Sequence, residues 1–172
     1  MRRAVAAGLA IVVSGQVAAA ADNPVFAGLV GDWIGDGMVR RGPDAEPERV
    51  FCRVTNAIVA DGAALEQEGR CAVAANSGPI KGLITDLGSG EYGGTLESIA
   101  TDGPATLSGT GTEDGSGLVL DTRFIDRVTG EPVISVTTID LVPEGGYRIT
   151  SERTNPRDGE TFTASEIVFS AK

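Results

Sequence analysis

Two segments with alternating apolar and polar positions flank the dipeptide Asp61-Gly62. Asp-Gly favours a two-residue type I′ turn, because both central residues of that turn take positive φ. With these two residues as the loop, Cys52 falls directly opposite Cys71, although the turn assignment makes no use of the cysteines. Directly opposed residues of antiparallel strands lie within disulfide range. The pattern therefore predicts a β-hairpin closed by a Cys52–Cys71 disulfide.

The same register separates an apolar face of the hairpin from a charged face. The apolar face is predicted to hold Val50, Cys52, Val54, Ile58, Leu65, Cys71 and Val73. The opposite face carries Arg53, Glu66, Glu68 and Arg70, which is typical of a solvated surface. The hairpin is therefore expected to turn its apolar face toward a core.

Short segments with alternating or β-branched residues, each ended by a turn signal, continue to the end of the chain. Strands are predicted near residues 33–41, 48–59, 63–75, 79–87, 91–100, 105–112, 117–127, 133–142, 147–153 and 161–170. Ten strands without long crossovers would leave exposed sheet edges, and closure removes them. The predicted fold is all-β, an antiparallel up-and-down barrel of about ten strands with a short N-terminal helix.

That helix is predicted in "DNPVFAGLVG". Asn23 suits the N-cap and Pro24 suits the first helical position. Val25, Phe26 and Leu29 would form its apolar face. No later segment shows a helical period over a comparable length.

The first residues have the pattern of a secretory signal peptide. Arg2 and Arg3 precede a short apolar run, and alanines supply the cleavage region. Residues 1–21 are therefore predicted to be a signal peptide and 22–172 a single β-barrel domain. The paired cysteines agree with an oxidising compartment. We expect a periplasmic or secreted protein that does not insert into a membrane after the signal is removed.

The charge of the chain bears on its partners. The formal net charge is −10, and without Arg2 and Arg3 the chain keeps 12 basic groups against 24 acidic ones. This balance opposes binding to nucleic acid. The chain has no histidine, which argues against Ser–His and Cys–His catalysis and against the usual haem and zinc ligands. No cofactor and no metal are expected.

"LVGDWIGDG" resembles the G-x-W start of calycin-like β-barrels, namely lipocalins, fatty-acid-binding proteins and nitrobindin-like proteins. The resemblance implies that Trp33 packs across the closed end of the barrel beneath the short helix. Without a histidine, the haem ligand of the nitrobindin-like proteins is not carried over. "GDWIGDG…FCRV…GRCAV" also resembles a group of exported alphaproteobacterial proteins, which implies nothing about activity.

Fatty-acid-binding barrels hold a carboxylate with inward arginines, so the arginines of the later strands are candidate ligand-binding residues, above all Arg123 and Arg148. The strand patterns of "LVLDTRFIDR" and "YRITSER" favour an outward position for both, with Arg123 beside Asp121. The sequence is compatible with an inward, ligand-binding position and with an outward, solvated position of these two arginines. Arg127 and Arg153 lie in the same two segments.

Two further constellations are candidates for chemistry. The paired carboxylates Asp32 and Asp36, or Glu66 and Glu68, could serve as acid and base, but aromatic residues for a substrate cleft are only 5% of the chain. "GTEDGSG" lacks the ligand order of a calcium loop and fits a tight hairpin turn better.

The sequence thus favours a non-catalytic binder of a small apolar or amphipathic molecule in the periplasm. The alternative is an envelope structural or interaction module whose barrel is filled by its own side chains. The two differ in the interior, where small inward residues such as Gly109, Ser135, Thr137 and Ala164 would leave room for a ligand. An enzyme is not expected.

Overall fold

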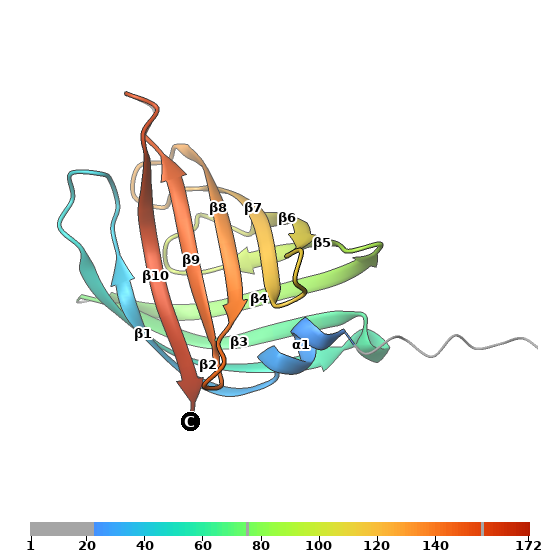
Figure 1. Cartoon of the computed structure of the whole chain (residues 1–172). Coiled ribbons are helices and arrows are strands. Elements are labelled where there is room, and N and C mark those ends of the chain that lie inside the picture. The colour runs from blue at the N-terminus through green and yellow to red at the C-terminus, as the bar shows by residue number, and fades with distance from the viewer. Residues whose placement is uncertain (1–22, 75, 156) are drawn as a thin grey trace, which may run out of the picture.

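Ten antiparallel strands close into one barrel, with a six-residue helix before the first strand. The computed structural model describes residues 23–74, 76–155 and 157–172. The elements are α1 (Pro24–Leu29), β1 (Gly31–Val39), β2 (Glu48–Val59), the 3-10 turn η1 (Ala60–Gly62), β3 (Ala64–Val73), β4 (Asn76–Gly88), β5 (Glu91–Glu97), β6 (Ala105–Gly111), β7 (Gly117–Ile125), β8 (Pro132–Leu141), β9 (Tyr147–Thr154) and β10 (Thr161–Ala171). The predicted all-β barrel, its strand number and its short helix are confirmed (Figure 1).

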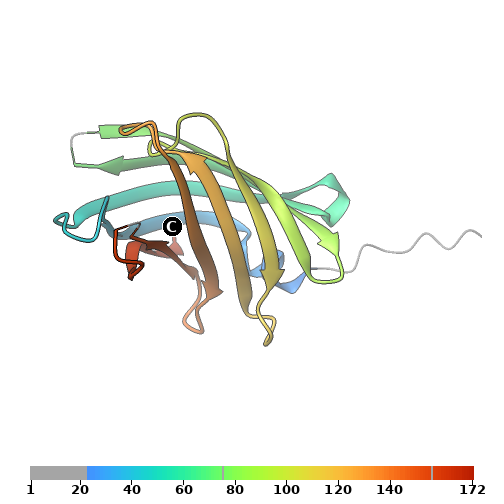
Figure 2. The ribbon, with the colours of Figure 1, turned by 90° about the horizontal axis from the view of Figure 1, so that it is seen from above.

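The strands follow one another around the barrel in chain order, and β1 pairs with β10 to complete the ring. Every pairing is antiparallel, so successive strands run in opposite directions as an up-and-down barrel requires. Figure 2 shows the strands curving around a common interior. Each of the ten described strands is therefore paired on both sides.

The hairpin of β2 and β3 has the predicted register. Cys52 lies opposite Cys71, and their sulfur atoms form a disulfide. In the turn, Ala63 N–H donates to the Ala60 carbonyl at 3.1 Å, while Asp61 and Gly62 have φ of 53° and 97°. These values fit the predicted type I′ turn. β2 ends at Val59 as predicted, whereas β3 begins at Ala64, one residue later than predicted, and Ala60 beside the turn also takes a positive φ of 53°.

One residue of the predicted apolar face departs from it. Ile58 lies next to the turn at the end of the barrel, where its side chain is 43% exposed. The other six predicted members are buried, namely Val50, Cys52, Val54, Leu65, Cys71 and Val73. The alternation is thus correct, and the exception lies where the barrel wall ends.

Inward glycines allow neighbouring strands to approach closely where the sheet bends. A Cβ at Gly94 would overlap the Leu83 carbonyl oxygen, and a Cβ at Gly109 would overlap that of Val119. Both glycines therefore serve curvature. Gly109, one of the residues expected to leave room for a ligand, leaves none, because the neighbouring backbone occupies that space.

The two ends of the barrel differ, and we name them by their residues. The helix end holds α1 and the turns after β2, β4, β6 and β8, with Trp33, Tyr147 and Phe169 inside. The polar end lies where β1, β3, β5, β7 and β9 finish, and the inner wall beside it carries Thr122, Ser135, Thr137, Ser151 and Arg153. In Figure 1, α1 lies at one end of the barrel, near the turn that joins β2 to β3.

The predicted signal peptide, residues 1–21, lies outside the described residues. Within the described part of the chain, no helix has the length and apolar character needed to cross a bilayer. The Cys52–Cys71 disulfide indicates a location outside the cytoplasm.

Candidate functional site

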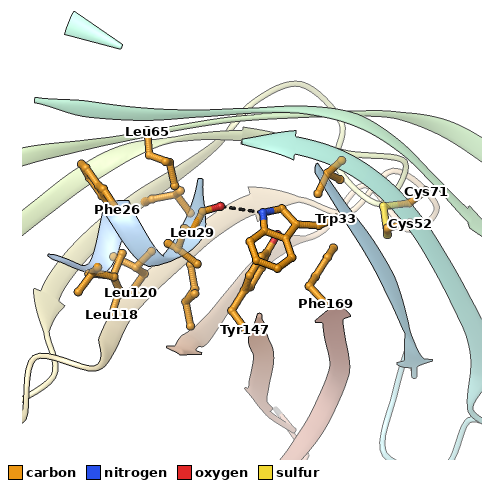
Figure 3. Packing of buried hydrophobic residues seen from close by; sticks show 14 of the residues in the cluster. Phe26, Leu29, Trp33, Cys52, Leu65, Cys71, Leu118, Leu120, Tyr147 and Phe169 are labelled. Atoms are coloured by element: carbon orange, nitrogen blue, oxygen red, sulfur yellow. Dashed lines mark hydrogen bonds between the residues drawn. A yellow bond between two sulfur atoms is a disulfide. The ribbon is translucent and has the colours of Figure 1, made fainter. Parts of the chain in front are cut away.

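Trp33 closes the helix end of the barrel, as the resemblance implied. Its indole Nε1 donates to the Leu29 carbonyl at 2.8 Å, and its ring meets the Tyr147 ring edge-on at 5.3 Å between centroids. Tyr147 in turn stacks on Phe169 at 4.5 Å. Figure 3 shows these rings packed together beside the Leu29 end of α1. Aromatic packing of this kind leaves no space for a ligand at this level.

A buried polar network surrounds the Tyr147 hydroxyl. Asn56, only 3% exposed, donates from Nδ2 to the Leu29 carbonyl at 2.9 Å and to the Tyr147 hydroxyl at 3.2 Å. Gln67 donates from Nε2 to Asn56 Oδ1 at 3.0 Å. Burial raises the pKa of Tyr147, so its phenol stays neutral at physiological pH. The network fixes the C-terminal end of α1 and offers no ionised group for chemistry.

Asn23 fixes the other end of α1. Its Oδ1 accepts from Val25 N–H and Phe26 N–H, each at 3.1 Å, which is the predicted N-cap. Its Nδ2 donates to Asp86 Oδ2 at 2.7 Å and to the Tyr92 hydroxyl at 2.8 Å. The helix is thus held to the barrel at both ends, and the helix end is filled by the protein itself.

The polar end has a different inner wall. Thr122, Ser135 and Arg153 form one inward row across β7, β8 and β9. Thr137 and Ser151 lie in the next row toward the helix end. The Thr137 hydroxyl is 3.1 Å from both the Thr122 and the Ser151 hydroxyl, which gives a continuous hydroxyl chain. Three neighbouring strands therefore present hydrogen-bonding groups to the interior.

Arg153 is the charged member of this wall. Its guanidinium Cζ lies 5.2 Å from the centroid of the Phe124 ring, and its Nε is buried with no hydrogen-bond partner among the residues that the structure describes. Burial lowers the pKa of Arg153, and the nearby Asp126 carboxylate opposes that shift. An arginine keeps its charge in proteins. The interior therefore contains a positive group with an unused donor.

The Asp126 carboxylate itself is held by the turn after β7. Burial acts to raise its pKa, but N–H groups of Thr129 and Val128 donate to Oδ1 at 3.0 and 2.8 Å and bring the pKa below its usual value. Asp126 is therefore engaged by backbone donors, and no ion pair with Arg153 forms within 4.0 Å among the described residues.

An apolar wall faces the polar one. β2, β3 and β4 lie across the barrel from β7, β8 and β9 in the strand order. Their inward residues toward the polar end include Val50, Val73 and Ile80. Ile80 is only partly buried, as are Thr137, Ser151 and Arg153, so solvent reaches both walls. The inward side chains at the polar end are thus apolar on one wall and hydrogen-bonding on the other.

The arginines predicted as ligand-binding candidates lie outside this interior. Arg123 is exposed and lies 3.8 Å from Asp121, as the outward alternative stated. Arg148 is exposed and lies 3.4 Å from Glu166. The structure therefore places neither guanidinium in the barrel, and the inward arginine is Arg153. The signal for it was in the sequence, because Arg153 shares the strand parity of Tyr147 and Ile149.

Of the small inward residues expected to leave room, Ser135 and Thr137 do line the polar end. Ala164 is buried beside a register shift in β10, between Thr163 and Ser165, where the strand bulges. The bulge brings Ser165 opposite Ser151, which extends the hydroxyl row by one strand.

The carboxylates considered for catalysis lie on the outer face. Asp36 pairs with Arg49, and this contact lowers the pKa of Asp36. Asp32 accepts from the Thr55 hydroxyl at 2.6 Å. Two hollows also open on the outside, one of 210 Å³ beside Glu66, Glu68 and Lys81 and one of 120 Å³ beside Asp32 and Arg53.

Among the described residues, no three carboxylate or cysteine side chains are placed so that together they could hold a metal ion. The segment "GTEDGSG" is a tight turn, in which Asp114 accepts from the Thr112 hydroxyl at 2.8 Å and the Ser116 hydroxyl at 2.7 Å. These contacts turn the carboxylate toward its own loop.

Comparison with known proteins does not extend this description. No protein-family model matches the chain, and no curated protein matches it. The closed ten-stranded barrel with a helix across one end is consistent with a calycin-like fold.

Proposed function

We propose that this chain is an exported, calycin-like barrel that binds a small amphipathic molecule without transforming it. The ligand would occupy the polar end of the interior. The observation that carries the proposal is the contrast between the two walls there, with hydroxyls and Arg153 on β7, β8 and β9 facing apolar side chains on β2, β3 and β4. Ligand sites commonly combine an apolar lining with a few oriented polar groups.

Export is supported by two independent features. The first residues have the charge and apolar pattern of a signal peptide, and the barrel contains a disulfide. Both features support a periplasmic or secreted location. The calycin-like assignment is supported by the G-x-W start together with the closed barrel and the helix that Trp33 contacts.

The non-catalytic reading is supported by where the carboxylates lie. The pairs that could act as acid and base are on the outer surface and do not face the barrel interior. General acid–base work requires such groups within hydrogen-bonding reach of a bound substrate.

The alternative, an interaction module with a filled barrel, is favoured by the helix end. There Trp33, Tyr147 and Phe169 fill the interior, and the polar network fixes α1. Under this alternative, side chains of the polar end would enclose only water.

Leucine substitutions at two neighbouring residues of β9 distinguish a ligand-binding barrel from a filled interaction module. Ser151→Leu places a larger side chain on the inner wall, whereas Thr150→Leu places it on the outer face of the same strand. The neutral probe N-phenyl-1-naphthylamine is titrated against both variants and the unaltered protein. Native mass spectrometry of protein purified from its own periplasm checks for a co-purifying molecule.

We expect the probe to bind the unaltered protein and Thr150→Leu alike, and to lose at least about tenfold in affinity on Ser151→Leu, because about 1.4 kcal/mol of lost contact is a factor of ten. Equal binding by both variants, or no binding and no co-purifying molecule, would overturn the proposal and leave the filled module.

A further inference from the structure

The outer face of β7 and β8 presents apolar side chains to solvent. Ile134 is 62% exposed and Val136 is 40% exposed on β8, while Ile125 and Val119 are 40% and 38% exposed on β7. The two strands are neighbours in the barrel wall (Figure 1), so their outward residues within 119–125 and 132–138 form one surface, which we name the β7–β8 face. Exposed apolar patches mark interaction sites.

The β7–β8 face has no net charge, in a chain whose formal net charge is −10. Its charged outward residues are one acid and one base, Asp121 and Arg123. The neighbouring outward residues of β6 are Thr106, Ser108 and Thr110. Two copies of a strongly acidic protein repel each other. That repulsion is weak at the β7–β8 face, which therefore suits a second copy of the chain.

The two charges of the face are placed so that they complement a second copy. Thr122 pairs with Ser135 at the centre of the face. A two-fold axis that lies in the interface and crosses both strands there exchanges residues at equal distances on either side. Asp121 then faces the partner's Arg123. Within one copy these two groups lie 3.8 Å apart, which is beyond hydrogen-bond distance, so each is available to the other copy.

The same axis brings apolar side chains against apolar side chains. Val136 and Ile134 lie at equal distances from Ser135, so Val136 faces the partner's Ile134. Val119 and Ile125 lie at equal distances from Thr122 and are exchanged in the same way. Because the outer side of a barrel is convex, the closest contact is at the centre, where the most exposed of these residues, Ile134, lies.

The strands beside the face introduce no pair of like charges. On β9, Glu152 lies opposite Val136 and precedes the residue that pairs with Ser135, so the axis brings Glu152 to the partner's Thr154. On β6, Ser108 comes to the partner's Thr106. The complementarity therefore extends over four neighbouring strands.

Other exposed apolar side chains lack this complementarity. Phe51 lies between the outward residues Arg49 and Arg53 of β2, so an axis at Phe51 would bring Arg49 to the partner's Arg53. Leu83 pairs with Glu66, and an axis through that pair would bring Glu66 to its own copy. Like charges that meet in an interface cost several kcal/mol.

We propose that the chain forms a two-fold dimer through the β7–β8 face, with Asp121 of each copy against the partner's Arg123 and Ile134 at the centre. Four strands about 4.8 Å apart and seven residues of about 3.3 Å each outline an area of roughly 19 by 23 Å. The contact is thus no larger than a standard interface of about 800 Å² per partner, which indicates a dissociation constant in the micromolar range. The proposal concerns the outside of the barrel and does not depend on the proposed function.

The test reverses one charge at a time. Asp121→Arg leaves only positive charge at the two positions, and Arg123→Asp leaves only negative charge. The control variants, Asp36→Arg and Arg49→Asp, reverse the charges of an exposed ion pair on β1 and β2. Sedimentation equilibrium from micromolar to millimolar protein gives the dimer dissociation constant of each variant, and near-ultraviolet circular dichroism checks that each is folded.

We expect the unaltered protein and both control variants to dimerise, and Asp121→Arg and Arg123→Asp each to weaken the dimer at least about tenfold. An equal mixture of these two variants should recover association as a heterodimer, since opposite charges then meet. Ile134→Gln should also weaken the dimer at least about tenfold, because both copies lose the side chain. Leu87→Gln, at an equally exposed residue of β4, should not.

Three results would overturn the dimer. The first is an unaltered protein that stays monomeric up to millimolar concentration. The second is a mixture of Asp121→Arg and Arg123→Asp that associates no better than either variant alone. The third is a control variant that weakens association as much as the variants of the face, because net charge and not this surface would then be the cause.

Discussion

Trp33 on the first strand donates its indole N–H to the carbonyl of Leu29, the last residue of the helix. The helix and the barrel wall are thereby joined within five residues of chain. Trp33→Phe removes this bond and part of the buried ring, so we expect the free energy of unfolding to fall by about 2 kcal/mol. Urea unfolding followed by far-ultraviolet circular dichroism measures it. An unchanged urea midpoint would show that the Trp33 indole and its hydrogen bond do not contribute to stability.

The N-cap of the helix also contacts a carboxylate, which makes it sensitive to charge. Asn23→Asp keeps the capping oxygen but places a second carboxylate against Asp86, where Nδ2 now donates at 2.7 Å. We expect a loss of stability at pH 7 that shrinks as the pH falls toward 4, because one carboxyl of the pair then takes up a proton. Asn23→Ser is the control, since it caps without the added charge. A pH-independent difference between the two variants would contradict the prediction.

The turn between β2 and β3 contains an alanine in a glycine-like conformation. Ala60 has a φ of 53°, whereas Ala63, at the other end of the same turn, has a φ of −83°. Ala60→Gly should therefore raise the free energy of unfolding by about 1 kcal/mol, and Ala63→Gly should lower it by about 0.5–1 kcal/mol. Chemical unfolding of both variants tests this pair, and effects of the same sign would show that φ is not the cause.

Asp114 gives the clearest pH prediction. Hydrogen bonds from the Ser116 hydroxyl and N–H and from the Thr112 hydroxyl lower its pKa from 3.8 to about 2. A lowered folded-state pKa means that the stabilisation is present above about pH 4 and is lost as the pH falls toward 2. Carboxyl-carbon NMR should show Asp114 titrating well below the ordinary aspartate value of 3.8. Ser116→Ala should move its pKa upward, and no movement would contradict the assignment.

The disulfide crosses the middle of the hairpin wall, and both cysteines face the interior, where Cys52 is 1% exposed. Its removal in a Cys52→Ala, Cys71→Ala variant should lower the free energy of unfolding by about 3 kcal/mol, given a sequence separation of 19. Thermal unfolding of the oxidised protein and the variant measures the difference. Equal melting temperatures would mean that β2 and β3 are held by their hydrogen bonds alone.

The sequence predicted the β2–β3 hairpin and the helix well because the signals for them are local. Asp61-Gly62 set the hairpin register from its own dihedral preferences, and Asn23 and Pro24 set the helix start in the same way. Trp33 was placed at the closed end by resemblance, and its partner is only four residues away. Signals of this kind do not depend on the rest of the fold.

The candidate site was harder to predict, because it depends on which residues of distant strands meet. Strand parity alone puts Arg153 on the inner wall, yet its importance comes from the unpaired Nε and from Ser135 opposite it. Gly109 shows the converse. The space beside this small residue was expected to be free, but the backbone of the next strand occupies it. Neither fact can be read from one segment.

The pairing of β1 with β10 has a consequence for how the protein is made. Val39 and Ser165 sit side by side in that seam although most of the chain separates them. The ring cannot shut until its last strand has emerged, so the closing step is as non-local as the topology allows and should be slow. Slow closure would suit the export that we propose, because the chain would still be unfolded when it crosses a translocation channel.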